Sequence, residues 1–366
     1  MRGLAVIAAV GLTLGGCAIT PPTLFIPELE RTPTPPDPRL AASDAALAAL
    51  VDPALPGCSA AVGVRGEVAW ADAVGFADLS GTPLTTATRF DMASTSKQFT
   101  ATAILMLARD GALTLADPVG AYVEGLPWGG EVSLGQLMHH TSRIPDYWTV
   151  LDDQGIGFSD PADHAHILDA IRQLDLDDDL SPGAYSYSNS NYVLLAEVVN
   201  RVSGMPLPQF LAERIFTPLG LDMDLSPALV APDIALSIND DLTLQPHAWT
   251  AYGAIGIYST PSELARWGDQ YRESPLGIIQ DDFDDDPADE GTGEFYGAGL
   301  DLEPDGDLNH DGRFGGHITS FTVSADRETT VVVMCGWHLA PRYELADALW
   351  AIWVAPAESP APEEDG

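Results

Sequence analysis

Lysine is almost absent from this chain of 366 residues, which holds fifteen arginines but a single lysine, Lys97. Arginine can replace lysine wherever a permanent positive charge is needed, because its guanidinium group does not lose its proton in a protein. A lysine amine, in contrast, can become neutral when it is buried. The remaining lysine is therefore a candidate base. The alternative is a general preference for arginine, in which case the surroundings of the last lysine would be arbitrary.

The surroundings of Lys97 are not arbitrary. Ser94 precedes it by three positions, a spacing that places hydroxyl and amine on one face of a helix, one turn apart. Residues 98–110 are apolar on nearly all sides and end at Gly111, as expected of a helix buried in the domain centre. The pattern predicts a serine nucleophile activated by a neutral lysine at the start of a core helix.

Positive charge is scarce as a whole, since 16 basic residues face 54 acidic ones and the net charge is −38. A protein with so much negative charge is repelled by nucleic acids and by anionic membrane surfaces, so we do not expect it to bind to either. Much of the acidity lies in residues 175–179 and 281–286, which we interpret as solvated loops. A salt-rich habitat would produce the same excess. The apolar fraction of 46% is ample for a packed core.

Long hydrophobic runs are also missing. The apolar stretch from Leu4 to Leu14 is too short to span a bilayer and is typical of an export signal. It leads into Leu14-Gly15-Gly16-Cys17, which resembles the bacterial lipobox and implies cleavage before Cys17 and lipidation of its thiol. An ordinary secretory signal with a chance cysteine is the alternative.

These features predict an exported protein held by an N-terminal lipid anchor at the membrane, in the periplasm or at the cell surface. We expect residues 1–17 to be the signal and 18–43 a proline-rich linker. The folded domain that carries Ser94 and Lys97 would cover 44–354, and 355–366 would form a disordered acidic tail.

Only three cysteines are present, and setting Cys17 aside leaves Cys58 and Cys335. An even pair in an oxidising compartment is compatible with a disulfide. Cys58 opens one predicted strand and Cys335 ends another, so the two sulfur atoms would meet if these strands were antiparallel neighbours. Two separate buried thiols are the alternative, because cysteine is often a small core residue.

Strand signals cluster at the two ends of the domain, and helical signals fill the middle. The expected strands are 59–65, 67–77, 316–325 and 329–337, and the expected helices include 98–110, 134–139, 163–174, 192–202, 208–216 and 261–271. This order indicates an α+β fold, in which an antiparallel sheet flanked by helices carries an inserted all-helical subdomain at about 112–235.

A second polar element precedes the predicted helix at 192–202. Tyr187 and Asn189 lie two positions apart in an expected extended loop and would project to the same side. The phenol can relay a proton, and the amide can hold the lysine amine or a substrate carbonyl. Taken alone, such a segment is more often a helix-capping cluster.

Together these elements resemble the serine β-lactamase and penicillin-binding-protein-like superfamily, in particular the group with class C β-lactamases, D-Ala-D-Ala carboxypeptidases, D-aminopeptidases and related esterases. The motifs that carry the resemblance are Ser94-x-x-Lys97 and Tyr187-Ser188-Asn189, supported by 75–78, 89–90, 140–147, 191–192, 215–220 and 256–260. The resemblance implies a five-stranded antiparallel sheet beside a helical subdomain. It also implies that the first and last strands are neighbours, which favours the Cys58–Cys335 disulfide.

The resemblance assigns roles to these residues. Ser94 would be acylated, Lys97 would take its proton, Tyr187 would move a proton to the leaving group, and Asn189 would orient Lys97 or the acyl group. No cofactor or metal is implied. The Asp307, Asn309 and Asp311 positions match half of a calcium loop, but the residue that should supply a bidentate acid is Ile318, so a polar hairpin turn is the favoured interpretation.

The third family motif, Lys-Thr-Gly or His-x-Gly, departs from the pattern. Counting back from Phe321 places it at Phe314-Gly315-Gly316, with His317 as the oxyanion donor. A phenyl ring cannot pair a substrate carboxylate. We therefore expect a small-molecule or peptide substrate with an ester or amide bond and an esterase-like activity. The alternatives are a D-Ala-D-Ala carboxypeptidase or β-lactamase, and a catalytically silent penicillin-binding-like sensor.

Overall fold

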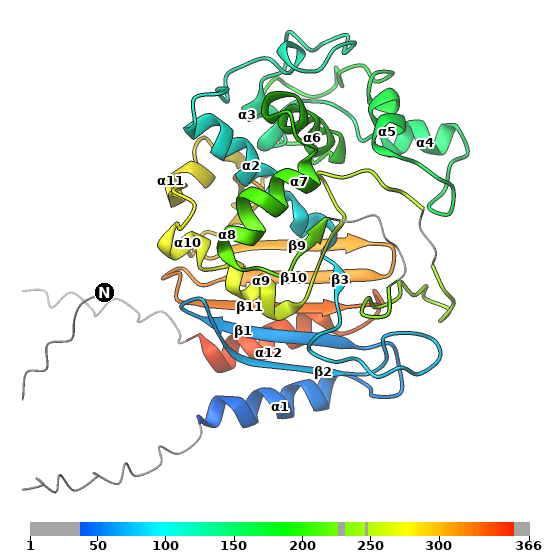
Figure 1. Ribbon diagram of the computed structural model, residues 1–366, viewed down its shortest axis with the longest axis vertical. Coiled ribbons are helices and arrows are strands. Elements are labelled where there is room, and N and C mark those ends of the chain that lie inside the picture. The colour runs from blue at the N-terminus through cyan, green and yellow to red at the C-terminus, as the bar shows by residue number, and fades with distance from the viewer. Residues whose placement is uncertain (1–36, 226–230, 246–247, 355–366) are drawn as a thin grey trace, which may run out of the picture. The chain divides into compact units, whose positions relative to one another are not determined.

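The computed structural model describes residues 37–225, 231–245 and 248–354 (Figure 1). The predicted signal with Cys17, most of the predicted linker and the tail 355–366 lie outside the described residues. The end of the predicted linker forms a helix instead, α1 (Pro38–Leu50). Asp37 caps this helix by accepting a hydrogen bond from the Arg39 backbone N–H at 2.9 Å, and a proline fits the first helical position.

Within the described residues, the main sheet has eight antiparallel strands in the order β2-β1-β11-β10-β9-β8-β7-β6, so the expected count of five is wrong. The long strands are β1 (Cys58–Val64), β2 (Glu67–Val74), β9 (Leu308–Phe314), β10 (His317–Val323) and β11 (Thr329–Cys335). The additional strands have two residues each: β6 (Ala288–Asp289), β7 (Phe295–Tyr296) and β8 (Asp301–Leu302). Strands this short show no alternation that a sequence pattern could reveal.

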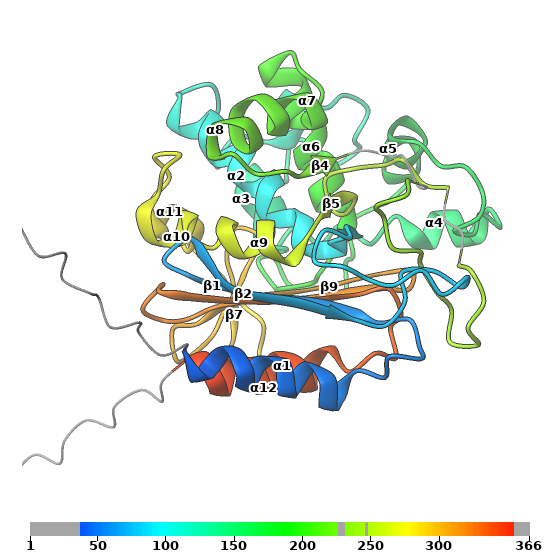
Figure 2. The same cartoon turned by 60° about the horizontal axis from the view of Figure 1, so that its bottom comes forward.

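Helices cover both faces of this sheet, as Figure 2 shows. On one face, α1 packs beside α12 (Arg342–Trp353), and both enclose an apolar layer with the sheet. The Trp353 indole N–H donates to Ser43 Oγ at 2.8 Å and so links the two helices. On the other face, α9 (Pro261–Trp267) lies against β1 and β11. Because both faces are covered, β11 is buried along its whole length.

The helical part lies beyond that second face and surrounds the buried helix α2 (Lys97–Arg109). Helix α6 (Asn189–Ser203) packs against α2 in this core. The other elements are η2 (Val119–Ala121), α3 (Leu134–Met138), α4 (Trp148–Asp153), α5 (His164–Ile171), α7 (Leu207–Leu211), the π-helical η3 (Ala212–Phe216), α8 (Thr217–Leu219), α10 (Gln270–Glu273) and α11 (Gln280–Phe283).

A small second sheet connects the two parts in the order β3-β5-β4. Its strands are β3 (Phe90–Asp91), β4 (Asp224–Leu225) and β5 (Ile257–Ser259). The strand β3 leads directly into the 3-10 turn η1 (Ala93–Ser96) and then into α2. This sheet therefore fixes where the first turn of α2 begins.

Cys58 and Cys335 face each other in register on β1 and β11 and form a disulfide, with an S–S distance of 2.06 Å. The bond joins residues 277 positions apart and ties the first strand of the main sheet to the last. Within the described ranges, no helix is long and apolar enough to cross a membrane.

Candidate active site

The turn that carries Ser94 is held by a buried carboxylate. Asp91 Oδ1 accepts hydrogen bonds from the backbone N–H groups of Ala93, at 2.8 Å, and Gly256, at 3.2 Å. Burial raises the pKa of Asp91 to about 6. Ala93 has φ of +51°, a left-handed conformation that favours glycine, so the turn holds a strained residue directly before Ser94.

Lys97 is the first residue of α2 and is completely buried. Its Nζ lies 3.1 Å from Ser94 Oγ and donates hydrogen bonds to Asn189 Oδ1, at 2.8 Å, and to the Ala254 carbonyl, at 3.1 Å. Burial lowers the pKa of Lys97 from 10.5 to about 7, although the nearby Asp146 carboxylate opposes this change. A neutral amine has two N–H donors, which Asn189 and Ala254 accept, so its lone pair is left for the Ser94 hydroxyl.

Asp146 holds Asn189 in this orientation. Its Oδ2 accepts from the Asn189 side-chain Nδ2, at 2.7 Å, and from the Asn189 backbone N–H, at 2.9 Å. The Asn189 amide therefore turns its oxygen towards Lys97. Asn189 is the first residue of α6 rather than part of an extended loop, so a helix start and not a loop positions its side chain.

Tyr187 lies over the amine, with Lys97 Nζ 4.9 Å from its ring centroid. Burial raises the pKa of Tyr187 above its usual value, and a hydrogen bond with Ser94 partly opposes this change. The residue is still 39% exposed, so its ring also forms part of the open surface of the site. The buried His140 ring packs against it in a tilted arrangement, at a centroid distance of 4.2 Å and an interplanar angle of 34°. His140 Nδ1 accepts from the Ser188 N–H at 3.2 Å, which fixes the chain next to Tyr187.

The strand β9 passes beside the Ser94 turn. A Cβ atom built on Gly312 would lie 2.2 Å from the Met92 carbonyl oxygen and 3.1 Å from Ala93 Cβ, so only glycine allows this approach. The strand β8 pairs with Leu308 and Asn309 alone, and the rest of this edge of β9 has no neighbouring strand among the described residues.

The pairing of β9 with β10 sets the direction of the backbone N–H groups along that edge. Phe314 pairs with His317 across a two-residue turn, so these two residues exchange backbone hydrogen bonds. Because hydrogen-bonded and non-hydrogen-bonded pairs alternate, the Arg313 N–H points away from β10 and towards the open edge.

The predicted third motif is placed differently from what we expected. Phe314 ends β9, and Gly315 and Gly316 form the turn to β10, instead of standing at the start of the strand beside Ser94. The His317 ring accepts from the Asp91 N–H at Nδ1, at 3.2 Å, and its Nε2 lies 3.0 Å from the Ala235 carbonyl. The His317 N–H belongs to the pair with Phe314, so it does not point into the site.

The residues beside Ser94 are instead His310-Asp311-Gly312 of β9, which match the His-x-Gly form of the motif. His310 is buried, its Nε2 lies 3.0 Å from the Tyr296 hydroxyl and its Nδ1 lies 2.7 Å from the Asp311 carbonyl. Burial lowers the pKa of His310 to about 3, with a smaller contribution from Lys97. This ring is neutral and both nitrogens have partners, so it is a poor partner for a substrate carboxylate.

The residues of the half calcium motif lie on or next to the strand β9, where two of its carboxylates have protein partners. Asp311 accepts a hydrogen bond from Arg342 at 3.0 Å, and Asp307 accepts one from the Ala325 N–H at 2.7 Å. Over the parts of the chain that are described, no group of three or more histidine, cysteine, aspartate or glutamate residues has a geometry suited to a metal ion.

A family model described as Beta-lactamase matches residues 43–351. The chain belongs to this family. A penicillin-binding protein of Bacillus subtilis is 33% identical over 164 residues, which are 43% of this chain and 35% of that protein. A D-aminopeptidase of Brucella canis is 28% identical over 302 residues, which are 76% of this chain and 56% of that protein. The chain thus spans about a third to little more than half of the length of these relatives.

Solved structures show the same fold. A D-amino acid amidase from Ochrobactrum anthropi superposes with a TM-score of 0.71 at 21% identity, covering 86% of this chain and 98% of that one. A D-stereospecific amidohydrolase from Streptomyces superposes with a TM-score of 0.69 at 22% identity, covering 88% and 100%. At such identities the likeness concerns the fold alone.

Sequence reasoning missed three residues of this site. Asp146 was included in a motif but received no role, although it orients Asn189. His310 and Gly312 lie in the run Asp307 to Gly312, for which the sequence favours a polar hairpin turn because the run is rich in Asp, Asn and Gly. The His-x-Gly pattern was the available signal, and it would have marked β9 as the strand beside the nucleophile.

Proposed function

We propose that this protein is a serine hydrolase that cleaves an ester or amide through an acyl-enzyme. The observation that carries the proposal is the buried Lys97 amine, 3.1 Å from Ser94 Oγ and with its pKa lowered to about 7. A base with a pKa near the working pH is well suited to remove a proton from a hydroxyl group.

In the proposed reaction, Lys97 Nζ takes the Ser94 hydroxyl proton while Oγ attacks the substrate carbonyl carbon. The negative charge that develops on the carbonyl oxygen would be stabilised by the backbone N–H groups of Ser94 and Arg313. Tyr187 would pass the proton to the leaving group as the bond to it breaks. A water molecule then attacks the acyl carbon and gives a proton to the same base. That proton passes to Ser94 Oγ as the acyl–oxygen bond breaks, which releases the carboxylic acid and restores the Ser94 hydroxyl.

The site favours substrates without a free carboxylate at the position that the third motif occupies, because His310 is neutral and engaged on both nitrogens. Arg313 supports a second candidate, since its side chain is exposed at the end of β9 and could attract a carboxylate. That candidate is a peptidase or β-lactamase activity, as the names of the penicillin-binding and D-aminopeptidase relatives would suggest.

One set of assays distinguishes these functions. We would measure p-nitrophenyl acetate hydrolysis, chromogenic cephalosporin hydrolysis and the intact mass of the protein with each substrate, for the natural protein and for Ser94→Ala, Lys97→Met and the surface control Ser80→Ala. The proposal expects ester turnover that only Ser80→Ala retains. Faster cephalosporin turnover would favour the second candidate. A normally folded protein that neither hydrolyses these substrates nor becomes acylated would contradict both hydrolase candidates and favour a silent sensor.

We also propose export and lipid anchoring through Cys17, on the strength of the sequence pattern around it. Replacing Cys17 with serine should move the protein from the membrane fraction to the soluble fraction of cells. An unchanged distribution would contradict the anchor without affecting the catalytic proposal.

A further inference from the structure

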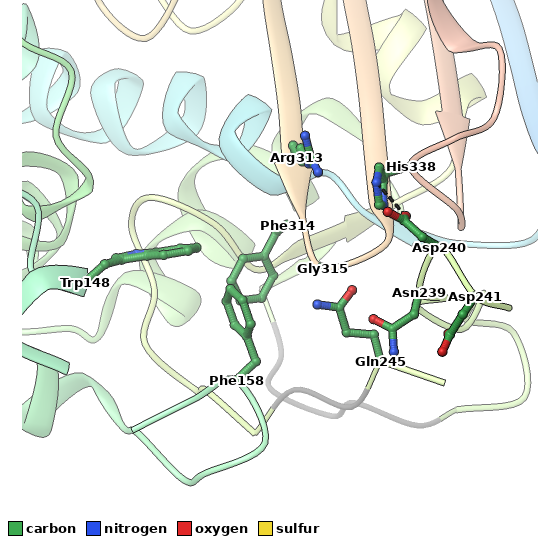
Figure 3. Close-up of a pocket in the computed structure, with 10 residues that line it drawn as sticks. All are labelled: Trp148, Phe158, Asn239, Asp240, Asp241, Gln245, Arg313, Phe314, Gly315 and His338. Atoms are coloured by element: carbon green, nitrogen blue, oxygen red, sulfur yellow. Dashed lines mark ion pairs between the residues drawn. The ribbon is translucent and has the colours of Figure 1, made fainter. Parts of the chain in front are cut away.

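A pocket of about 550 Å³ opens at the end of β9, which is within the size range of small-molecule sites (Figure 3). Its two walls differ in chemistry. Trp148, Phe158 and Phe314 form an aromatic wall, and Asn239, Asp241 and Gln245 belong to the polar wall on the other side. We call this cavity the aromatic pocket.

The aromatic wall is held rigidly. The Phe158 ring lies 5.4 Å from that of Phe314 and 5.1 Å from that of Trp148, both in edge-to-face geometry. Trp249 packs behind them, 5.0 Å from Phe158 and 5.4 Å from Trp148. Phe314 itself is buried, whereas Trp148 and Phe158 keep part of their surface exposed. Rings packed in this way are already ordered, so a ligand ring can bind against their apolar surface with little further loss of side-chain entropy.

The polar wall is fastened to the same strand turn. The Gly316 N–H donates to Ser237 Oγ at 2.7 Å, and a Cβ built on Gly315 would lie 3.7 Å from the Gln245 carboxamide. The loop that follows Ser237 is braced by Thr243, whose hydroxyl donates to Asp241 at 2.6 Å. The carboxamide of Gln245 points across the pocket towards the aromatic wall in Figure 3.

Two residues of the aromatic wall follow closely along the chain on residues of the catalytic site. Phe314 lies two positions beyond Gly312, which touches the Ser94 turn, and two strand residues span roughly 7 Å. Trp148 lies two positions beyond Asp146, which holds Asn189 against Lys97. These two short connections place the pocket close enough to the Ser94 turn for one substituent of a bound substrate to extend towards it.

We propose that the aromatic pocket binds an aromatic group of the substrate, either on the acyl part or on the leaving group. This inference rests on the proposed hydrolase function and names the substrate class of the same site. The ring would lie against Phe158 and Trp148, and a polar substituent on it would face Gln245. Phe314, which lies outside the third motif, thus contributes to substrate specificity as part of the aromatic wall.

The test compares three esters without a chromogenic aromatic leaving group: methyl acetate, methyl phenylacetate and benzyl acetate. Hydrolysis is followed by proton release in a pH-stat. We expect at least one aromatic ester to exceed methyl acetate in kcat/KM. Phe158→Ala should reduce that preference roughly 3- to 10-fold, the range for one aromatic contact, and leave methyl acetate unchanged. The control Leu79→Ala removes an exposed apolar side chain elsewhere and should change none of the three rates.

Two results would overturn the proposal while leaving the hydrolase function intact. One is the absence of any aromatic preference in the natural protein, and the other is an equal effect of Phe158→Ala on all three esters. If no ester is hydrolysed, the proposed function fails, and a binding experiment then tests whether the pocket holds an aromatic group. Phenylacetamide should quench the tryptophan fluorescence of Ser94→Ala saturably, and much less so after Phe158→Ala is added. No quenching in either protein would reject the pocket as well.

Discussion

Replacing Lys97 with methionine should change how the stability of the protein depends on pH. The unfolded chain titrates this amine near 10.5, but burial lowers its pKa in the folded protein to about 7. This difference corresponds to roughly 5 kcal/mol in favour of the neutral amine. Between the two pKa values the unfolded chain holds more protons, so the contribution of Lys97 to the free energy of unfolding rises with pH.

The size of this effect follows from the two pKa values. From pH 7 to pH 9, the free energy of unfolding of the natural protein should increase by about 2 kcal/mol relative to Lys97→Met. The lost hydrogen bonds of the amine change the absolute stability of the variant, but they add a constant that cancels in this comparison. Methionine is unbranched and has a similar length, so it should fill the same buried space.

Urea unfolding curves at pH 7, 8 and 9, followed by circular dichroism, measure this difference. Ser94→Ala is the matched control, because it keeps the buried amine and should show the pH dependence of the natural protein. The reasoning would be refuted if the free energy of unfolding depended on pH in the same way in the natural protein and in Lys97→Met from pH 7 to pH 9. This result would mean that the buried amine titrates as it does in the unfolded chain.

Three further predictions concern the surroundings of the nucleophile. Asp146→Asn removes a carboxylate that raises the pKa of Lys97, so the acidic limb of the pH–rate profile for ester hydrolysis should move to lower pH; a limb that moves to higher pH would contradict the assigned charge effect. Gly312→Ala places a methyl group 2.2 Å from the Met92 carbonyl oxygen and should lower kcat/KM at least tenfold. Gly130→Ala is the control, because its methyl group meets nothing within 4 Å and should leave kcat/KM unchanged. Equal activity of the two variants would show that β9 is not packed tightly on the Ser94 turn. Reducing the Cys58–Cys335 disulfide should lower the free energy of unfolding by roughly 3–5 kcal/mol, because this disulfide closes a long loop. Activity at 25 °C should be retained. An unchanged thermal midpoint after verified reduction would contradict this prediction.

The residues at the centre of the site could be predicted because their chemistry is local. Ser94 and Lys97 lie within one turn of each other along the chain, so their spacing alone brings them together. Tyr187 and Asn189 could be found because they lie at the start of an apolar helix. The end strands were also visible, since β1 and β11 are continuous apolar runs.

The strand beside the Ser94 turn could not be derived from the sequence in the same way. The strand β9 carries Asn309, Asp311 and Arg313 on one face, and a run rich in aspartate and glycine is typical of a turn. Only its pairing with β10 makes it a strand, and only its contact with the Ser94 turn explains Gly312. The aromatic pocket is equally invisible in the sequence, because Phe314 comes from a segment far along the chain from Trp148 and Phe158.

The most direct test of the neutral amine is the rate at which a fluorophosphonate labels Ser94 between pH 5 and pH 10. Intact mass and peptide mapping identify the labelled residue, and Ser94→Ala serves as the blank. We predict labelling at Ser94 alone, with a rate that rises with pH through a midpoint of about 7. Labelling at another residue, or a midpoint near the ordinary lysine value of about 10.5, would contradict the account.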